Sequence, residues 1–156
     1  MNKKDLDIAK KADIMHRAAS LYISSNIPRD YGTGDKYTAS EVHFLQYIVN
    51  NPGITVTELS YDWDISRAAS SMMTNKLERK GLIDSKPDET NKRKKKYFAT
   101  ENGKELNNAH LKYDSIVFKK TLDYMRETCS DENIEIMFQT LTSFINSLRK
   151  KRYRSK

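Results

Sequence analysis

Two helix-start signals that lie close together, at Thr55 and Ser66, most constrain the fold of this chain. The sequence TVTE at residues 55–58 is a capping box, in which the Thr55 hydroxyl and the Glu58 carboxylate satisfy backbone amides at a helix N-terminus. A short helix is therefore expected here. Its apolar residues follow at the helical spacing of three to four: Val56, Leu59 and Trp63.

A second, longer helix follows after a very short turn. Only Asp64 and Ile65 separate the first helix from Ser66, which suits the N-cap of the segment RAASSMMTNKLERK. Gly81 then ends the second helix, as glycine does in a C-terminal cap. The sequence thus predicts a short helix, a tight turn and a longer helix.

The longer helix has the residues needed to enter the major groove of DNA, which is about 12 Å wide. The residues at the leading end of this helix should be small or able to form hydrogen bonds. On the opposite face, we expect Ala69, Met73 and Leu77 to be buried against the core. Arg67 is the best candidate for reading a guanine edge, since its guanidinium can meet two acceptors; contact with phosphate or an acidic neighbour is the alternative. The predicted DNA-binding side comprises Ser66, Arg67, Ser70, Ser71, Thr74, Asn75 and Lys76.

A strongly basic hairpin should follow the two helices. Residues 82–86 and 94–99 have the pattern of short strands, and the polar turn 87–91 joins them. Tyr97 and Phe98 should point to opposite faces, so at most one anchors the hairpin to the core. A charge run alone is usually a solvated surface, but this position lies beside a bound duplex. We expect phosphate or minor-groove contacts from Lys86, Lys92, Arg93, Lys94 and Lys95.

Helical patterns flank this region on both sides. Apolar residues recur every three to four positions from Ile8 to Tyr22, and a second capping box, TASE at residues 38–41, begins another helix. Two long helical segments complete the chain, starting near Thr100 and at Ser130. The expected fold is mainly α (α+β), with five or six helices and one hairpin.

Composition narrows the class of protein. A chain of 156 residues suits one domain, and a net charge of +7 with a pI near 9.4 favours a polyanionic partner, nucleic acid first. No apolar run approaches the roughly 20 residues of a membrane span, and the N-terminus lacks a secretory-signal pattern, so we expect a cytoplasmic protein. No nucleophile motif or phosphate-binding glycine loop indicates an enzyme, and no cofactor is expected.

The ordered segments TASEVHFLQYI, TVTELS, ISRAASSMMTNKLERKGLI and DETNKRKKKYFATENGKEL resemble the MarR family of winged helix-turn-helix transcriptional regulators. LERKGLI and the T-x-x-G of residues 100–103 are the most specific parts. The resemblance implies a homodimeric repressor on a pseudo-palindromic DNA operator, released by a small-molecule inducer. It also implies one MarR-like domain (1–156), with a winged helix-turn-helix lobe (38–100), dimerisation helices (5–25 and 101–149) and a basic tail (150–156).

Four positions depart from that family's usual pattern, one of which is Ser60, where alanine is commoner. Asn91 stands two residues before Arg93, where the family usually has an acidic residue, so Arg93 must be held by hydrogen bonding or by Asp88. Asp64 stands where glycine is commoner, and it tolerates a left-handed turn better than most residues. Trp63 stands where the family places a core leucine, and we interpret it as a packing residue.

Other residues allow alternative functions. His43 and His110, with Glu41 and Asp114 close by, can form a metal-sensing site, as in some relatives. Because no H-x-x-x-H pair or nearby cysteine completes the set, packed histidines and no metal are the preferred interpretation. Cys129 is either a redox switch or an incidental cysteine.

Four tyrosines, Tyr22, Tyr47, Tyr113 and Tyr124, are either the lining of a ligand pocket or core and interface residues. The remaining alternative to an operator-specific regulator is a non-specific architectural DNA binder.

Overall fold

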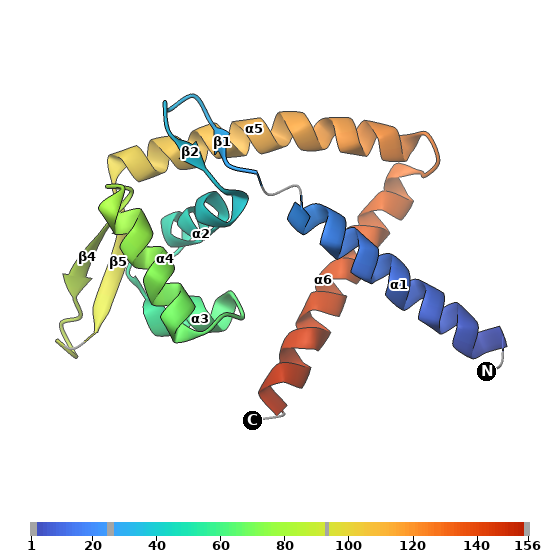
Figure 1. Ribbon diagram of the computed structural model, residues 1–156, viewed down its shortest axis with the longest axis horizontal. Helices are drawn as coiled ribbons and strands as arrows, with labels where there is room; N and C mark the ends of the chain where they lie inside the picture. Colours follow the sequence, from blue (N-terminus) through green and yellow to red (C-terminus); the bar gives the residue numbers. More distant parts are fainter. Residues whose placement is uncertain (1–2, 25–26, 93, 155–156) are drawn as a thin grey trace.

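Six helices and five short strands make up the part of the chain that the computed structural model describes, which is residues 3–24, 27–92 and 94–154 (Figure 1). The elements are, in chain order, α1 (Lys3–Ser24), β1 (Arg29–Asp30), β2 (Lys36–Tyr37), α2 (Ala39–Asn50), β3 (Ile54–Thr55), α3 (Val56–Asp62), α4 (Arg67–Arg79), β4 (Ile83–Pro87), β5 (Lys95–Ala99), α5 (Glu101–Arg126) and α6 (Asp131–Arg154).

The predicted helix starts of the central lobe are confirmed. Thr38 with Glu41 and Thr55 with Glu58 form reciprocal capping boxes, and the Ser66 hydroxyl accepts a hydrogen bond from the amide of Ala69. These caps leave only a few residues in the turn between α3 and α4. The two helices pack against each other. The starts of these helices are therefore determined by residues that are close in the sequence.

Two residues of the lobe adopt the left-handed backbone conformation that the sequence predicts. Gly81, after α4, has φ +67°, and Asp64, between α3 and α4, has φ +53°. Among the described residues, Asp64 is the only non-glycine residue with a positive φ. A short polar side chain of this kind tolerates the conformation because it can hydrogen-bond locally.

The predicted hairpin forms one side of a three-stranded antiparallel sheet with strand order β3-β5-β4. Tyr97 of the central strand pairs with Ile54 on one side and Ser85 on the other. Tyr97 is buried and Phe98 is half-buried, so the predicted alternation is confirmed. The strand β3 and the small sheet β1-β2 were not predicted, because strands of two residues carry no periodic signal.

The exit from the sheet explains the T-x-x-G motif. The Thr100 hydroxyl donates to the Gly81 carbonyl oxygen at 2.7 Å and accepts from the Gly103 amide at 3.1 Å, which ties the end of α4 to the start of α5. A Cβ added at Gly103 would lie 2.0 Å from the Leu82 carbonyl oxygen. Only glycine allows α5 to pass the sheet this closely.

The apolar core lies in the lobe and against the start of α5, and it includes Phe44, Leu45, Ile48, Leu59, Leu77, Ile83 and Leu106. The long helices extend outside it. Helix α5 runs from the lobe along one side of the molecule, and α6 turns back from its far end (Figure 1). Residues 150–154, predicted as a separate basic tail, continue α6 as helix. None of the helices, as far as the described residues go, is long and apolar enough to cross a membrane.

Candidate nucleic-acid interface

The leading end of α4 is exposed, as a helix that reads DNA requires. Ser66 and Arg67 are both exposed, and so is Asn75 two turns further along. Ser71 is half-buried at the edge of the same face. These four predicted residues are therefore at least partly accessible, and their contact with DNA stays a prediction.

Two residues predicted for this face are buried. Ser70 and Thr74 are fully enclosed; the Ser70 hydroxyl donates to the Val56 carbonyl oxygen at 3.3 Å, and the Thr74 hydroxyl donates to Ser71. Their predicted contact with bases is therefore wrong, because their only polar atoms face α3 and their own helix. Small hydroxylic side chains suit a close approach of α3 to α4, since their donors find backbone acceptors.

The outward stripe of α4 is correspondingly different from the predicted one. Ala69, expected to be buried, is exposed, and Met73 is only half-buried, while Leu77 is buried as expected. Sequence reasoning missed Met72, which is 73% exposed in the middle of the helix. An exposed methionine there offers an apolar surface of the kind that contacts thymine methyl groups. Met72 and Asn75 are three positions apart, which indicates that they lie on the same face of the helix.

A buried carboxylate anchors the far end of α4. Glu41, at the start of α2, accepts from Lys80 Nζ at 2.7 Å and lies 3.2 Å from Lys76 Nζ. Burial opposes ionisation of Glu41, but the hydrogen bonds from Lys80 and Thr38 outweigh it and lower the pKa to about 2. Lys76, predicted to contact DNA, therefore has an intramolecular anion as its partner and is about half-exposed.

The hairpin β4-β5, hereafter the wing, carries exposed lysines around its tip. Lys86, Lys92, Lys94 and Lys95 are all exposed. They add positive charge beside α4, to which β4 is packed. Lys86 Nζ lies 5.5 Å from the centroid of the Phe98 ring, which helps to keep its stem against the sheet.

Asp88 orders the turn of the wing. Its carboxylate accepts from the Thr90 amide at 2.9 Å and from the Thr90 hydroxyl at 2.8 Å, and it lies 3.7 Å from Lys96 Nζ. The Thr90 hydrogen bonds hold the pKa of Asp88 below its usual range. Arg93, the predicted tip residue, lies outside the described residues, so its proposed dependence on Asp88 stays a prediction.

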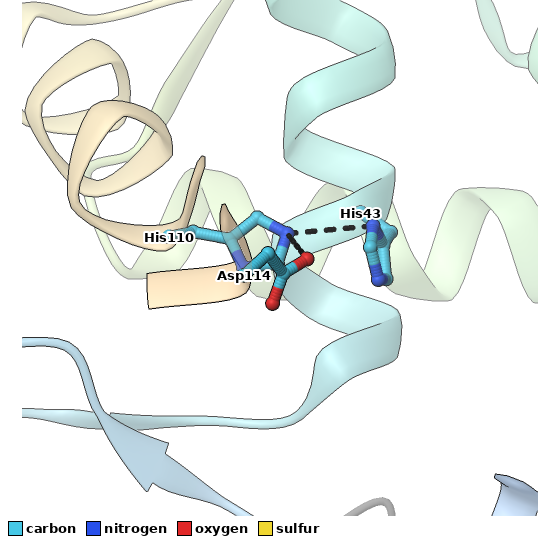
Figure 2. Close-up of side chains that lie close together, drawn as sticks. All are labelled: His43, His110 and Asp114. Carbon is cyan, nitrogen blue, oxygen red and sulfur yellow. Dashed lines mark hydrogen bonds and ion pairs between the residues drawn. The ribbon is translucent and has the colours of Figure 1, made fainter. Parts of the chain in front are cut away.

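A group of polar side chains joins α2 to α5 (Figure 2). His110 Nε2 lies 3.4 Å from His43 Nδ1 and 3.4 Å from Asp114 Oδ2, and one donor atom from each of the three residues lies within 4.8 Å of the others. His110 is buried, and this burial lowers its pKa, an effect that His43 reinforces and Asp114 opposes. Glu41, predicted nearby, is instead bound by its lysines.

The four tyrosines do not form one pocket lining. Tyr47 packs against the core, and the Tyr113 hydroxyl accepts from Arg29 at 2.7 Å, but Tyr22 and Tyr124 are each more than 70% exposed on α1 and α5. Cys129 is an exposed free cysteine before α6. Trp63 stacks edge-on against Phe44 with 5.0 Å between ring centroids, which confirms its interpretation as a packing residue.

A short helix, a tight turn, a second helix and a basic wing define a winged helix-turn-helix, a class of DNA-binding domain. Residues 37–95 match the model of the MarR family. The family match thus covers α2 to β4, which include the helix-turn-helix and the first strand of the wing.

A known regulator is similar to part of the chain. The chain is 38% identical over 69 residues to an uncharacterized HTH-type transcriptional regulator, YybA, of Bacillus subtilis (strain 168), a match that covers 44% of this chain. This chain therefore matches about half, 46%, of the length of that relative.

Two solved structures share the whole fold. The transcriptional regulator SlyA is 22% identical with a TM-score of 0.75, covering 96% of this chain and 99% of its own. Streptococcus pneumoniae FabT, solved in complex with DNA, is 21% identical with a TM-score of 0.67, covering 93% and 97%. The long helices α1, α5 and α6 thus belong to the same fold as the lobe.

Proposed function

We propose that this protein is a sequence-specific, DNA-binding transcriptional regulator that acts as a homodimeric repressor on a pseudo-palindromic operator. The observation that supports this most is the exposed leading end of α4, with Ser66, Arg67 and Asn75, next to a wing with four exposed lysines. The FabT structure, which contains DNA, has the same fold. Arg67 would read a base edge, and the wing would hold the backbone.

The long helices support the homodimer. Large apolar side chains are exposed on all three, among them Ile8 and Leu21 of α1, Ile116 of α5, and Ile145 and Leu148 of α6. Large apolar side chains exposed repeatedly along three helices are typical of an interface. A second copy would cover it and would present two α4 helices to successive major grooves, spaced by about 34–36 Å.

Release of DNA by a small-molecule inducer is part of the proposal. Such a ligand acts only by binding more tightly to a dimer whose two α4 helices are wrongly spaced.

Fluorescence anisotropy with a labelled duplex over a series of salt concentrations tests the DNA-binding function. The proposal predicts binding at low salt and a steep linear fall of log affinity with log salt concentration, because bound lysines and arginines release counterions. No binding at low salt would exclude the DNA function.

A second candidate function is metal sensing through His43, His110 and Asp114. Two ligands of a tetrahedral zinc ion, each about 2.0–2.1 Å from it, lie about 3.4 Å apart. His110 Nε2 has that separation from both His43 Nδ1 and Asp114 Oδ2. Two imidazoles and a carboxylate suit zinc or a similar divalent transition metal, with water as a fourth ligand. Bound metal would fix the lobe helix α2 against α5.

Competition against a chromogenic zinc chelator tests this second function. His110→Asn should abolish tight binding of one zinc ion per chain, whereas His16→Asn, which changes the exposed histidine of α1, should leave it intact. Equal zinc affinity in the wild type and the His110→Asn variant would exclude the site.

A further inference from the structure

We infer that Arg149 of α6 and Asp64 of the α3–α4 turn form a strut that fixes the start of the recognition helix relative to the C-terminal helix. Arg149 would then be a positioning residue for DNA binding, although it lies far from the bases. The inference concerns this contact itself, and its consequence for DNA affinity rests on the function proposed above.

One guanidinium makes both contacts of the strut. Arg149 Nε donates to Asp64 Oδ2 at 2.7 Å, and Arg149 Nη2 donates to the carbonyl oxygen of Asp62. The two residues are 85 positions apart in the sequence. The Asp64 side chain is only 26% exposed, so solvent weakens this ion pair less than it weakens one on an open surface. The Asp64 hydrogen bond also raises the pKa of Arg149.

The backbone conformation of Asp64 gives an independent reason to assign it a role. With φ +53°, Asp64 has a conformation in which glycine would be free of steric strain. The turn already holds itself through backbone hydrogen bonds from Asp64 to Tyr61 and from Ile65 to Ser60. These backbone hydrogen bonds do not use the Asp64 carboxylate, which contacts α6 through Arg149.

The position of the contact connects the two parts of the proposed mechanism. Asp64 directly precedes Ile65 and Ser66, the N-cap of α4, and Arg67 follows at once. Helix α6 belongs to the helices whose exposed apolar residues indicate the dimer interface. A displacement of α6 would move Arg149, pull on the turn, and change the angle at which α4 meets the duplex.

Two variants separate the strut from general effects of charge. Arg149→Gln removes the guanidinium that donates both hydrogen bonds of the strut. Asp64→Gly removes the carboxylate that accepts one of them, and it also relieves backbone strain. Asp64→Gly also removes a negative charge near the DNA-binding face, which by itself should strengthen DNA binding. The strut instead predicts that Asp64→Gly weakens DNA binding. Lys104→Gln, which breaks an exposed ion pair with Glu101 on α5, is the control with the same change in charge as Arg149→Gln.

The experiment measures two quantities on the full-length protein and its variants. Hydrogen–deuterium exchange without DNA should become faster at the amides of residues 62–67 in both strut variants, with exchange in α2 unchanged. The affinity for a duplex selected from a random pool should fall roughly two- to five-fold in each variant beyond the control. The double variant should be no weaker than either single variant.

The alternative outcomes are distinct. Unchanged exchange at residues 62–67 in both variants would overturn the strut, whether or not the wild type binds DNA. Faster local exchange with Asp64→Gly binding DNA as tightly as the wild type, or more tightly, would overturn the positioning role. A wild type that binds no DNA would instead refute the proposed function, and the exchange measurement would still decide the strut.

Discussion

Lys80 Nζ, at the C-terminal end of the recognition helix α4, lies 2.7 Å from Oε1 of Glu41, at the first turn of α2. The carboxylate is buried, with its side chain only 3% exposed, and it also accepts from the amide and hydroxyl of Thr38. One ionised group therefore caps α2 and anchors α4. Neutralising it leaves Lys80, whose side chain is 32% exposed, without its anion and weakens the hydrogen bonds that hold the start of α2 to the end of α4.

We expect Glu41 to make stability depend on pH in acid. Its pKa in the folded state is about 2, below its ordinary value of 4.5, so the ionised form stabilises the fold fully above pH 4.5 and the contribution is lost as the pH falls toward 2. The contribution is up to about 3 kcal/mol. Urea unfolding of the wild type and Glu41→Gln between pH 2.5 and 7, about the span of this titration, should show a difference that shrinks in acid. Glu101→Gln, at an exposed pair, should show no such trend.

Gly103→Ala should destabilise the protein, although helix propensity alone favours alanine by about 1 kcal/mol. The added methyl group would lie 2.0 Å from the Leu82 carbonyl oxygen, so α5 or the sheet must shift. We expect a loss of about 1–3 kcal/mol in the free energy of unfolding. Asn108→Ala, at an exposed position of the same helix, should be neutral or slightly stabilising. A Gly103→Ala variant as stable as the wild type would contradict the close approach.

Arg67→Ala should relax base preference as well as weaken binding. A bidentate contact with guanine contributes about 1–3 kcal/mol of discrimination at one base pair. Arg79→Ala, at the other end of α4, where Arg79 Nε donates to the Asn75 carbonyl oxygen, is the matched control. Selection of bound sequences with each variant measures the preference. Equal losses on selected and random DNA for Arg67→Ala would remove Arg67 from base reading.

Lys94→Ala and Lys95→Ala in the wing should weaken binding to all sequences alike. Each lost phosphate contact should reduce the slope of log affinity against log salt concentration by about one. We predict the same for Arg93→Ala from its position in the sequence. A change of sequence preference with an unchanged salt slope would instead assign base contacts to the wing.

Ile116→Asp should dissociate the proposed dimer. Ile116 is 54% exposed on α5, so the substitution costs little within one chain, but it would bury a charge at an apolar interface. Sedimentation velocity at micromolar concentration should show a dimer for the wild type and a monomer for the variant. A monomeric wild type would contradict the interface.

Local signals explain how much of the fold could be predicted from the sequence. The capping residues Thr38, Thr55 and Ser66 and the left-handed turn at Gly81 depend on neighbours within a few residues, and all are confirmed. The very short strands carry no such signal. Their existence depends on pairing between distant segments, as for Ile54 with Tyr97.

The candidate site was predicted less well, for a physical reason. Serine and threonine suit both a DNA-facing surface and a close helix contact, and only the packing of α3 against α4 shows that Ser70 and Thr74 serve the second purpose. No short sequence motif links His43 to His110, so the 3.4 Å separation of their ring nitrogens depends on the packing of α2 against α5.

Selection of bound duplexes from a random DNA pool, followed by competition of the selected duplex against bulk DNA, tests the central claim most directly. The account predicts a pseudo-palindromic sequence with half-sites about one helical turn apart, bound at least about a thousandfold more tightly than random DNA. Enrichment of no sequence, with equal affinity for selected and random DNA, would contradict operator-specific regulation and leave a non-specific DNA binder.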